Sequence, residues 1–169
     1  MSHELGLRFN SPTVNLWFTP KEFIKFLSQL EHYLYDCKIE MDDKNSEKYG
    51  YPVGKLEDIH VYFTHYETFE LAKQKWIERL KRLNMDNLYI IMVQKDGCTE
   101  QDICSFDSLK FKHKVIFTVK EYPQYRSAYY IPKSEVDIQN VKNLCDYQSR
   151  FTGKRWLDEF DWISFLNER

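Results

Sequence analysis

Strand-like and helix-like patterns of hydrophobic residues alternate along most of the chain. Residues 59–64 are rich in β-branched and aromatic side chains, which predicts a strand. Apolar residues then recur three or four positions apart from Phe69 to Leu83, which predicts a helix over about 68–83 with one buried face. Residues 88–93 are apolar at nearly every position, as in a central strand covered on both faces. These segments together predict a β-α-β unit.

A further strand and helix are predicted ahead of this unit. Residues 13–18 contain β-branched and aromatic side chains and favour a short strand. Thr19 can cap a helix that has Pro20 at its first position and Glu22 as the partner in a capping box. We expect this helix to end near Tyr35.

The remaining patterns extend the alternation to the end of the chain. Predicted are a short strand at 37–41, a charged surface loop at 42–48, a turn at 51–54, a helix capped by Thr99 and Asp102, strands at 114–119 and 127–131, and loose helices at 136–145 and 156–165. This order favours an α/β protein with helices layered on a mostly parallel or mixed sheet. We expect a single domain over residues 1–169, with the strands at 13–18, 59–64, 88–93 and 114–119 in one sheet.

Composition narrows the class of protein. The chain has 169 residues, enough for one domain, and a net charge of −2, which does not suggest a nucleic-acid partner. No apolar run is long enough for a membrane span, and no secretory signal is visible. The spacing of the four cysteines matches no C-x-x-C zinc pattern, so we name no metal ligand. We therefore expect reduced thiols in a cytoplasmic protein.

A polar loop follows the strand at 88–93 and begins the next helix. In it, Asp96 is a candidate catalytic group, and Gly97, Cys98 and Thr99 are candidate ligand-binding residues, because backbone amides at a helix start can hold phosphate or carboxylate. An ordinary tight turn with a helix cap is the alternative. A Cys98 thiol at a helix start would have a lowered pKa, but no base for it is identifiable.

His65 follows the strand at 59–64 and is the candidate general base. If the strands at 59–64 and 88–93 are parallel neighbours, His65 and Asp96 lie at the same edge of the sheet, where ligands bind in open α/β sheets. A structural role for this histidine is the alternative.

Four other residues are ligand-binding candidates, and they are Asn10, Ser11, Lys55 and Arg126. Arg126 belongs to an aromatic and basic cluster with Tyr122, Tyr125, Tyr129 and Tyr130. Aromatic faces and arginine suit sugar rings or a partner protein. An edge strand with packed tyrosines is the alternative for the cluster, and a turn-stabilising role is the alternative for Ser11.

Several segments together resemble a bacterial family of unknown function, DUF1919, that is usually described as exopolysaccharide or capsule biosynthesis proteins. They are LGLRFNSPTVNL at 5–16, YPVGKL at 51–56, FTHY at 63–66, Trp76 with Arg79 and Arg82, DNL at 86–88, DGCT at 96–99 and YYIP at 129–132. The resemblance implies a three-layer α/β/α fold and a place in surface-polysaccharide loci. Relatives carry a strand before the first segment, where this chain has only residues 1–4, so we expect that strand to be missing here.

Two functions from different classes fit these patterns. The first is a transferase of surface-polysaccharide assembly that acts on a sugar or a nucleotide-linked sugar, with Asp96 and His65 in a cleft. The second is a non-catalytic module that binds a protein or a glycan through the surface at 122–130. The sequence leaves the cofactor and the oligomeric state open.

Overall fold

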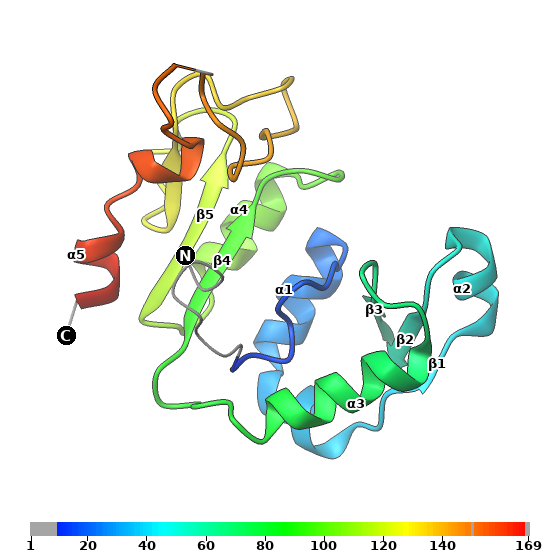
Figure 1. Ribbon diagram of the computed structural model, residues 1–169. Coiled ribbons are helices and arrows are strands. Elements are labelled where there is room, and N and C mark those ends of the chain that lie inside the picture. Colours follow the sequence, from blue (N-terminus) through cyan, green and yellow to red (C-terminus); the bar gives the residue numbers. More distant parts are fainter. Residues whose placement is uncertain (1–9, 150, 168–169) are drawn as a thin grey trace. The chain divides into compact units, whose positions relative to one another are not determined.

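The computed structural model describes residues 10–149 and 151–167 (Figure 1). The chain forms two compact units, unit 1 (Met1–Asp86) and unit 2 (Asn87–Arg169), and each is described by itself. The segment 1–4 and residues 5–9 of the first family-like segment lie outside the described residues. The prediction of one domain over residues 1–169 stays a prediction.

Unit 1 contains an antiparallel sheet in the order β1 (Glu40–Met41), β2 (Val53–Leu56) and β3 (Ile59–Tyr62). β2 and β3 form a hairpin in which Leu56 pairs with Ile59, so only two residues make the turn. The sequence predicts β1 and β3, but it predicts a turn where β2 begins, and that prediction is wrong.

The packing around Gly54 explains why β2 contains a glycine. A Cβ at this position would come within 2.9 Å of the side chains of Ile39 and Phe63, which pack against the backbone there. The glycine therefore permits a close approach of side chains to the strand rather than a turn.

Two helices of unit 1 start where the sequence predicts them, and α1 uses its predicted cap. α1 (Pro20–Ser28) starts at Thr19, whose hydroxyl accepts the Glu22 amide hydrogen, and a π-helical turn, η1 (His32–Asp36), follows it. α3 (Phe69–Leu80) starts at Thr68 and buries its predicted stripe, including Trp76. Trp76 packs against Phe26 of α1, with ring centroids 6.3 Å apart.

Two further predictions in unit 1 are wrong. The charged segment 42–48 is largely a helix, α2 (Asp43–Tyr49), because the Asp42 side chain caps its start and Gly50 ends it in the left-handed conformation. The strand predicted at 13–18 is a turn, in which the Ser11 hydroxyl accepts the Thr13 amide hydrogen. Only Trp17 of that segment makes a strand-like bridge, to Tyr62.

His60 connects three elements of unit 1. Its Nδ1 lies 2.7 Å from a Glu22 carboxylate oxygen in α1, and its Nε2 lies 3.2 Å from a carboxylate oxygen of Asp42, the cap of α2. The His60 backbone amide also donates to Glu22. This histidine therefore ties β3 to two helices.

Unit 2 contains a parallel sheet in the order β4 (Tyr89–Val93), β5 (His113–Thr118) and β6 (Ala128–Tyr130). α4 (Glu100–Asp107) connects β4 to β5, which gives a β-α-β unit (Figure 1). The predicted capping box between Thr99 and Asp102 is confirmed.

The C-terminal segments pack against a buried hydrophobic cluster of unit 2. The buried cluster there consists of Val115, Phe117, Val119, Ile131, Val141, Leu144 and Phe165. Phe165 comes from α5 (Trp162–Asn167), which follows the short 3₁₀ helix η2 (Trp156–Glu159). The helix predicted at 136–145 is wrong, because this segment is irregular and its Val141 amide donates to the Gln94 carbonyl.

The single sheet expected from the sequence is also wrong for the described residues. β3 belongs to the antiparallel sheet and β4 to the parallel one. The reason is local, because β2 pairs with β3 through a two-residue turn and Tyr62 on β3 bridges Trp17 on the other side. The α/β class is confirmed, and the three-layer arrangement stays a prediction. No helix among the described residues is long and apolar enough to cross a membrane.

Candidate functional site

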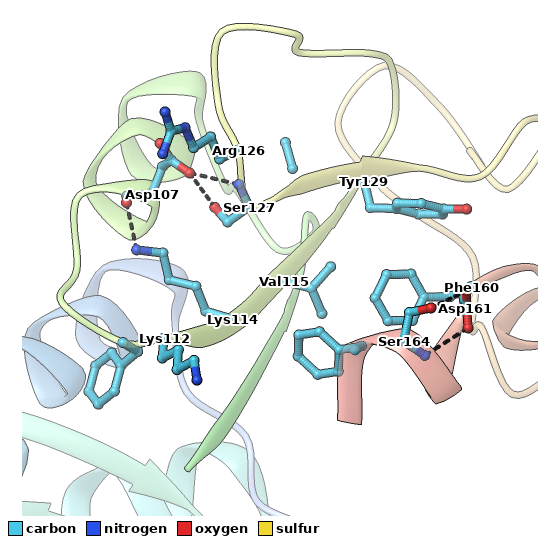
Figure 2. Close-up of a pocket in the computed structure, with 13 residues that line it drawn as sticks. Asp107, Lys112, Lys114, Val115, Arg126, Ser127, Tyr129, Phe160, Asp161 and Ser164 are labelled. Carbon is cyan, nitrogen blue, oxygen red and sulfur yellow. Dashed lines mark hydrogen bonds between the residues drawn. The ribbon is translucent and has the colours of Figure 1, made fainter. Parts of the chain in front are cut away.

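A pocket of about 810 Å³ lies in unit 2, at the amino ends of β5 and β6 (Figure 2). The end of α4 and the residues of α5 complete its wall. Its lining consists of Asp107, Phe111, Lys112, Lys114, Val115, Arg126, Ser127, Ala128, Tyr129, Phe160, Asp161, Ser164 and Phe165. In Figure 2, Asp107, Lys114 and Arg126 lie at one end and Tyr129 and Phe160 at the other. The pocket therefore has a charged end and an aromatic end.

Lysine and arginine make the charged end cationic. Lys112 and Arg126 are exposed, and neither has an ion-pair or hydrogen-bond partner among the described residues. Lys114 differs, because its Nζ donates to the Asp107 carbonyl at 2.6 Å and to the Leu109 carbonyl. Burial lowers the pKa of Lys114. Lys114 is thus held by the end of α4, and Lys112 and Arg126 are the cations open to a ligand.

Two carboxylates in the lining are held by hydroxyl and amide groups. An Asp107 oxygen accepts hydrogen bonds from the Ser127 amide and hydroxyl, both at 2.7 Å, which fixes the start of β6 against α4. Asp161 accepts from the Ser164 hydroxyl at 2.6 Å and from its amide at 2.9 Å. These hydrogen bonds hold the pKa of Asp161 below its usual value. Both carboxylates thus serve to shape the pocket.

Aromatic side chains form the other end. The Tyr129 and Phe160 rings meet edge to face with centroids 4.9 Å apart, and Phe160 also contacts Phe165. Tyr129 is 37% exposed, and its hydroxyl donates to the Glu159 carbonyl at 3.2 Å, which fixes the ring. A rigid, partly exposed ring is a surface on which the apolar face of a sugar can pack.

Comparison with known proteins places the chain in a family. A family model described as a domain of unknown function, DUF1919, matches residues 1–167. The chain belongs to the DUF1919 family. It is similar to an uncharacterized protein of Haemophilus influenzae (strain Rd), with 42% identity over 165 residues, which is 98% of this chain and 77% of that protein. The predicted family is therefore confirmed, and its link to surface polysaccharides stays a prediction.

Of the site residues predicted for this DUF1919 chain, Arg126 is the one that lines the pocket. The Asp96 loop follows β4 and so lies at the carboxyl edge of the parallel sheet, whereas the pocket lies at the amino edge. Asp96 and Gly97 both have positive φ, 55° and 83°, as a tight turn requires.

The backbone amides of Asp96, Cys98 and Thr99 already donate to groups of the protein itself. The Thr99 amide donates to an Asp102 oxygen at 2.8 Å, so the protein's own carboxylate occupies that place. Cys98 is buried, and this burial raises the pKa of its thiol to about 12, opposite to the lowering expected at a helix start. The alternative of a capped tight turn describes this loop well, and the ligand roles of its residues stay predictions.

The other predicted residues belong to unit 1. His65 is exposed just after β3, and Lys55 is exposed on β2. The shared sheet edge expected for His65 and Asp96 is wrong, because β3 and β4 are not parallel neighbours in one sheet. Ser11 stabilises the turn that follows the exposed Asn10, since its hydroxyl lies 2.9 Å from that of Thr13.

Sequence reasoning missed most of the pocket for identifiable reasons. Lys112 precedes the strand predicted at 114–119 and Lys114 is its first residue, and both look like ordinary solvent-facing lysines. Phe160 and Phe165 belong to a segment that the sequence marks as packing on the body of the protein, and Phe165 does so. The available signal was the cluster around Arg126 and Tyr129, which the sequence did single out.

Proposed function

We propose that this DUF1919 protein binds an anionic sugar, a sugar phosphate or the sugar and phosphate parts of a nucleotide-linked sugar, in the unit 2 pocket. We further propose that it acts in surface-polysaccharide assembly as a transferase. The observation that supports binding most strongly is the presence of Lys112 and Arg126, two cations that have no partner among the described residues, in the same pocket as the exposed ring of Tyr129.

Each end of the pocket suits a different part of such a ligand. Arginine binds phosphate oxygens through paired hydrogen bonds, and lysine adds a point charge. The Tyr129 ring offers a face to the sugar. The volume of about 810 Å³ falls within the range of small-molecule sites. A neutral sugar would use only the aromatic end, so we expect the phosphate to contribute much of the affinity.

Binding can be tested by calorimetry with four probes. They are a uridine-diphosphate sugar, the matching sugar 1-phosphate, the neutral sugar and inorganic phosphate. We expect both sugar phosphates to bind more tightly than the neutral sugar or inorganic phosphate alone. Arg126→Gln should weaken sugar-phosphate binding by about tenfold to a hundredfold, as loss of a charge-assisted contact does.

Matched controls separate the pocket from general charge effects. Lys44→Gln removes an exposed lysine of α2 and should leave the affinity unchanged. Phe151→Ala removes a fully exposed aromatic ring outside the lining and is the control for Tyr129→Ala, which should weaken binding about tenfold. Equal effects of Arg126→Gln and Lys44→Gln would refute the site.

A non-catalytic glycan-binding module is the second candidate. It is favoured by one observation, the engagement of both pocket carboxylates, Asp107 with Ser127 and Asp161 with Ser164. A transferase would break the bond between the sugar and its phosphate and form a glycosidic bond to an acceptor hydroxyl, releasing the nucleoside diphosphate. Measuring nucleoside diphosphate with and without an oligosaccharide acceptor decides between them, because a module binds the donor without consuming it.

A further inference from the structure

We infer that unit 1 holds a divalent metal of the zinc type on His32, Cys37 and Glu57. One ligand atom from each of these residues lies within 4.8 Å of the other two, and no other such set of three occurs among the described residues. This site is independent of the sugar-binding proposal, because none of its residues lines the unit 2 pocket.

Two of the three distances between the ligand atoms match tetrahedral coordination, and the third, between Cys37 Sγ and the Glu57 carboxylate oxygen, is no more than 4.8 Å. His32 Nε2 lies 3.4 Å from Cys37 Sγ and 3.2 Å from a Glu57 carboxylate oxygen. In a tetrahedral zinc site with bonds of about 2.0–2.3 Å, the ligand atoms lie about 3.3–3.6 Å apart. His32 Nε2 therefore lies at the spacing from both other ligand atoms that a bound ion would need.

The choice of ligands favours zinc over other common ions. One imidazole nitrogen, one thiolate and one carboxylate form a mixed set that suits Zn²⁺, whereas Mg²⁺ and Ca²⁺ prefer oxygen ligands only. Three protein ligands leave a fourth position for water, as in sites that are not fully closed. His32 is 39% exposed and Glu57 59% exposed at their side chains, so an ion can enter from solvent.

A second carboxylate, that of Asp36, contacts the ring nitrogen of His32 that does not face the other ligands. His32 Nδ1 lies 3.3 Å from an Asp36 carboxylate oxygen, while Nε2 faces Cys37 and Glu57. A carboxylate on the far nitrogen fixes the ring and the tautomer in many zinc sites. Asp36 is thus a positioning residue and His32 Nε2 the ligand atom.

The fold brings the ligands together from separate segments. His32 and Cys37 lie at the two ends of the π-helical turn η1, where the Cys37 amide donates to the His32 carbonyl at 3.2 Å. Glu57 comes from the turn between β2 and β3 and has a φ of 50°, a conformation that favours glycine. Its neighbour Asp58 is held by Lys25 and Tyr33, which leaves Glu57 for the metal.

Metal binding by the tag-free full chain tests the proposal. After treatment with a chelator and dialysis, the protein is titrated with Zn²⁺, and with Co²⁺ as a spectroscopic probe. We expect one ion per chain, a thiolate-to-cobalt charge-transfer band and a rise in melting temperature with Zn²⁺. Cys37→Ser should abolish the band, and Asp36→Asn should weaken Zn²⁺ binding by about tenfold to a hundredfold.

Cys145→Ser is the matched control, because Cys145 is an exposed thiol outside the cluster, and it should retain the band. If Cys37→Ser fails to fold, Glu57→Gln in the exposed turn replaces it and should also weaken Zn²⁺ binding. No stoichiometric binding by the wild type, or an unchanged cobalt spectrum in Cys37→Ser, would overturn the site.

Discussion

The two units each contain a three-stranded sheet, but the strands of unit 1 are antiparallel and those of unit 2 are parallel. An antiparallel pair can close with a two-residue turn, as β2 and β3 do, whereas parallel neighbours need a crossover, which α4 supplies between β4 and β5. In unit 1 the turn itself therefore carries a candidate metal ligand, Glu57.

The parallel sheet of unit 2 places its chemistry differently. All strand starts lie at one edge, so residues distant in sequence, such as Lys112 and Arg126, line one pocket. The interiors also differ. Both units contain aromatic contacts, such as Phe26 with Trp76 in unit 1 and Phe160 with Phe117 and Phe165 in unit 2, but in unit 1 a histidine between two carboxylates also ties the elements together. Strand direction thus decides which residues can meet.

The largest expected effect is the loss of the Trp76 side chain from unit 1. Trp76 is 4% exposed and contacts Phe26, so Trp76→Ala should lower the free energy of unfolding by about 3–5 kcal/mol. Ile77→Ala on the same helix removes a side chain that is 43% exposed and should cost far less. Urea unfolding followed by circular dichroism measures both, and similar losses would show that the helix face is wrongly assigned.

The sequence predicts elements well where the signal is local. The Thr19 and Thr99 caps, the start of α3 near Thr68 and its apolar stripe are set by neighbouring residues, and all occur in the structure. Strand pairing is not local, so the apolar run at 88–93 gave no means of choosing β5 over β3 as its neighbour. For the same reason the sequence could not show that Asp96 and His65 follow strands of different sheets.

The candidate sites were less predictable for the same reason. Arg126 and Tyr129 were found because they lie close together in sequence. Glu57 lies twenty residues beyond Cys37, and only the β2–β3 hairpin brings it to the cysteine, so cysteine spacing alone could not reveal the set.

A glycine in each unit gives the next largest contrast. Gly54→Ala places a Cβ 2.9 Å from Ile39 and Phe63 in a packed strand, which should cost about 1–3 kcal/mol. Gly97→Ala meets no atom within 4 Å but must keep a φ of 83°, which should cost about 1–2 kcal/mol. Ile39→Val shortens the side chain that the new Cβ would meet, so it should reduce the cost of Gly54→Ala but not that of Gly97→Ala. A double-mutant cycle by urea unfolding checks this, and strict additivity would contradict the clash.

Helix caps allow a smaller comparison. Thr99→Ala removes both hydrogen bonds that the hydroxyl makes with Asp102, and it should lower stability by about 1 kcal/mol. Thr68→Ala in unit 1 removes a cap with only the Leu71 amide as a partner and should cost somewhat less. Thermal unfolding of both variants against Thr99→Ser, which keeps the hydroxyl, measures the difference. A neutral Thr99→Ala would mean that the capping box adds nothing.

The smallest expected effect concerns the acid stability of unit 1. Hydrogen bonds from the Asn45 amide and side chain, with a lesser contribution from the His60 charge, hold the pKa of Asp42 below its usual value. A carboxyl group whose folded pKa is lowered stabilises the fold above its unfolded pKa of about 3.9, and the contribution disappears as the pH falls through the folded value. Asp42→Asn keeps a good helix cap but removes this titration. The variant should therefore be slightly less stable than the wild type at pH 7 and should lose less stability between about pH 5 and pH 2.

Urea midpoints measured across that range test this prediction, with Asp43→Asn as the exposed neighbouring control. Parallel pH profiles for the wild type and Asp42→Asn would show that Asp42 does not contribute.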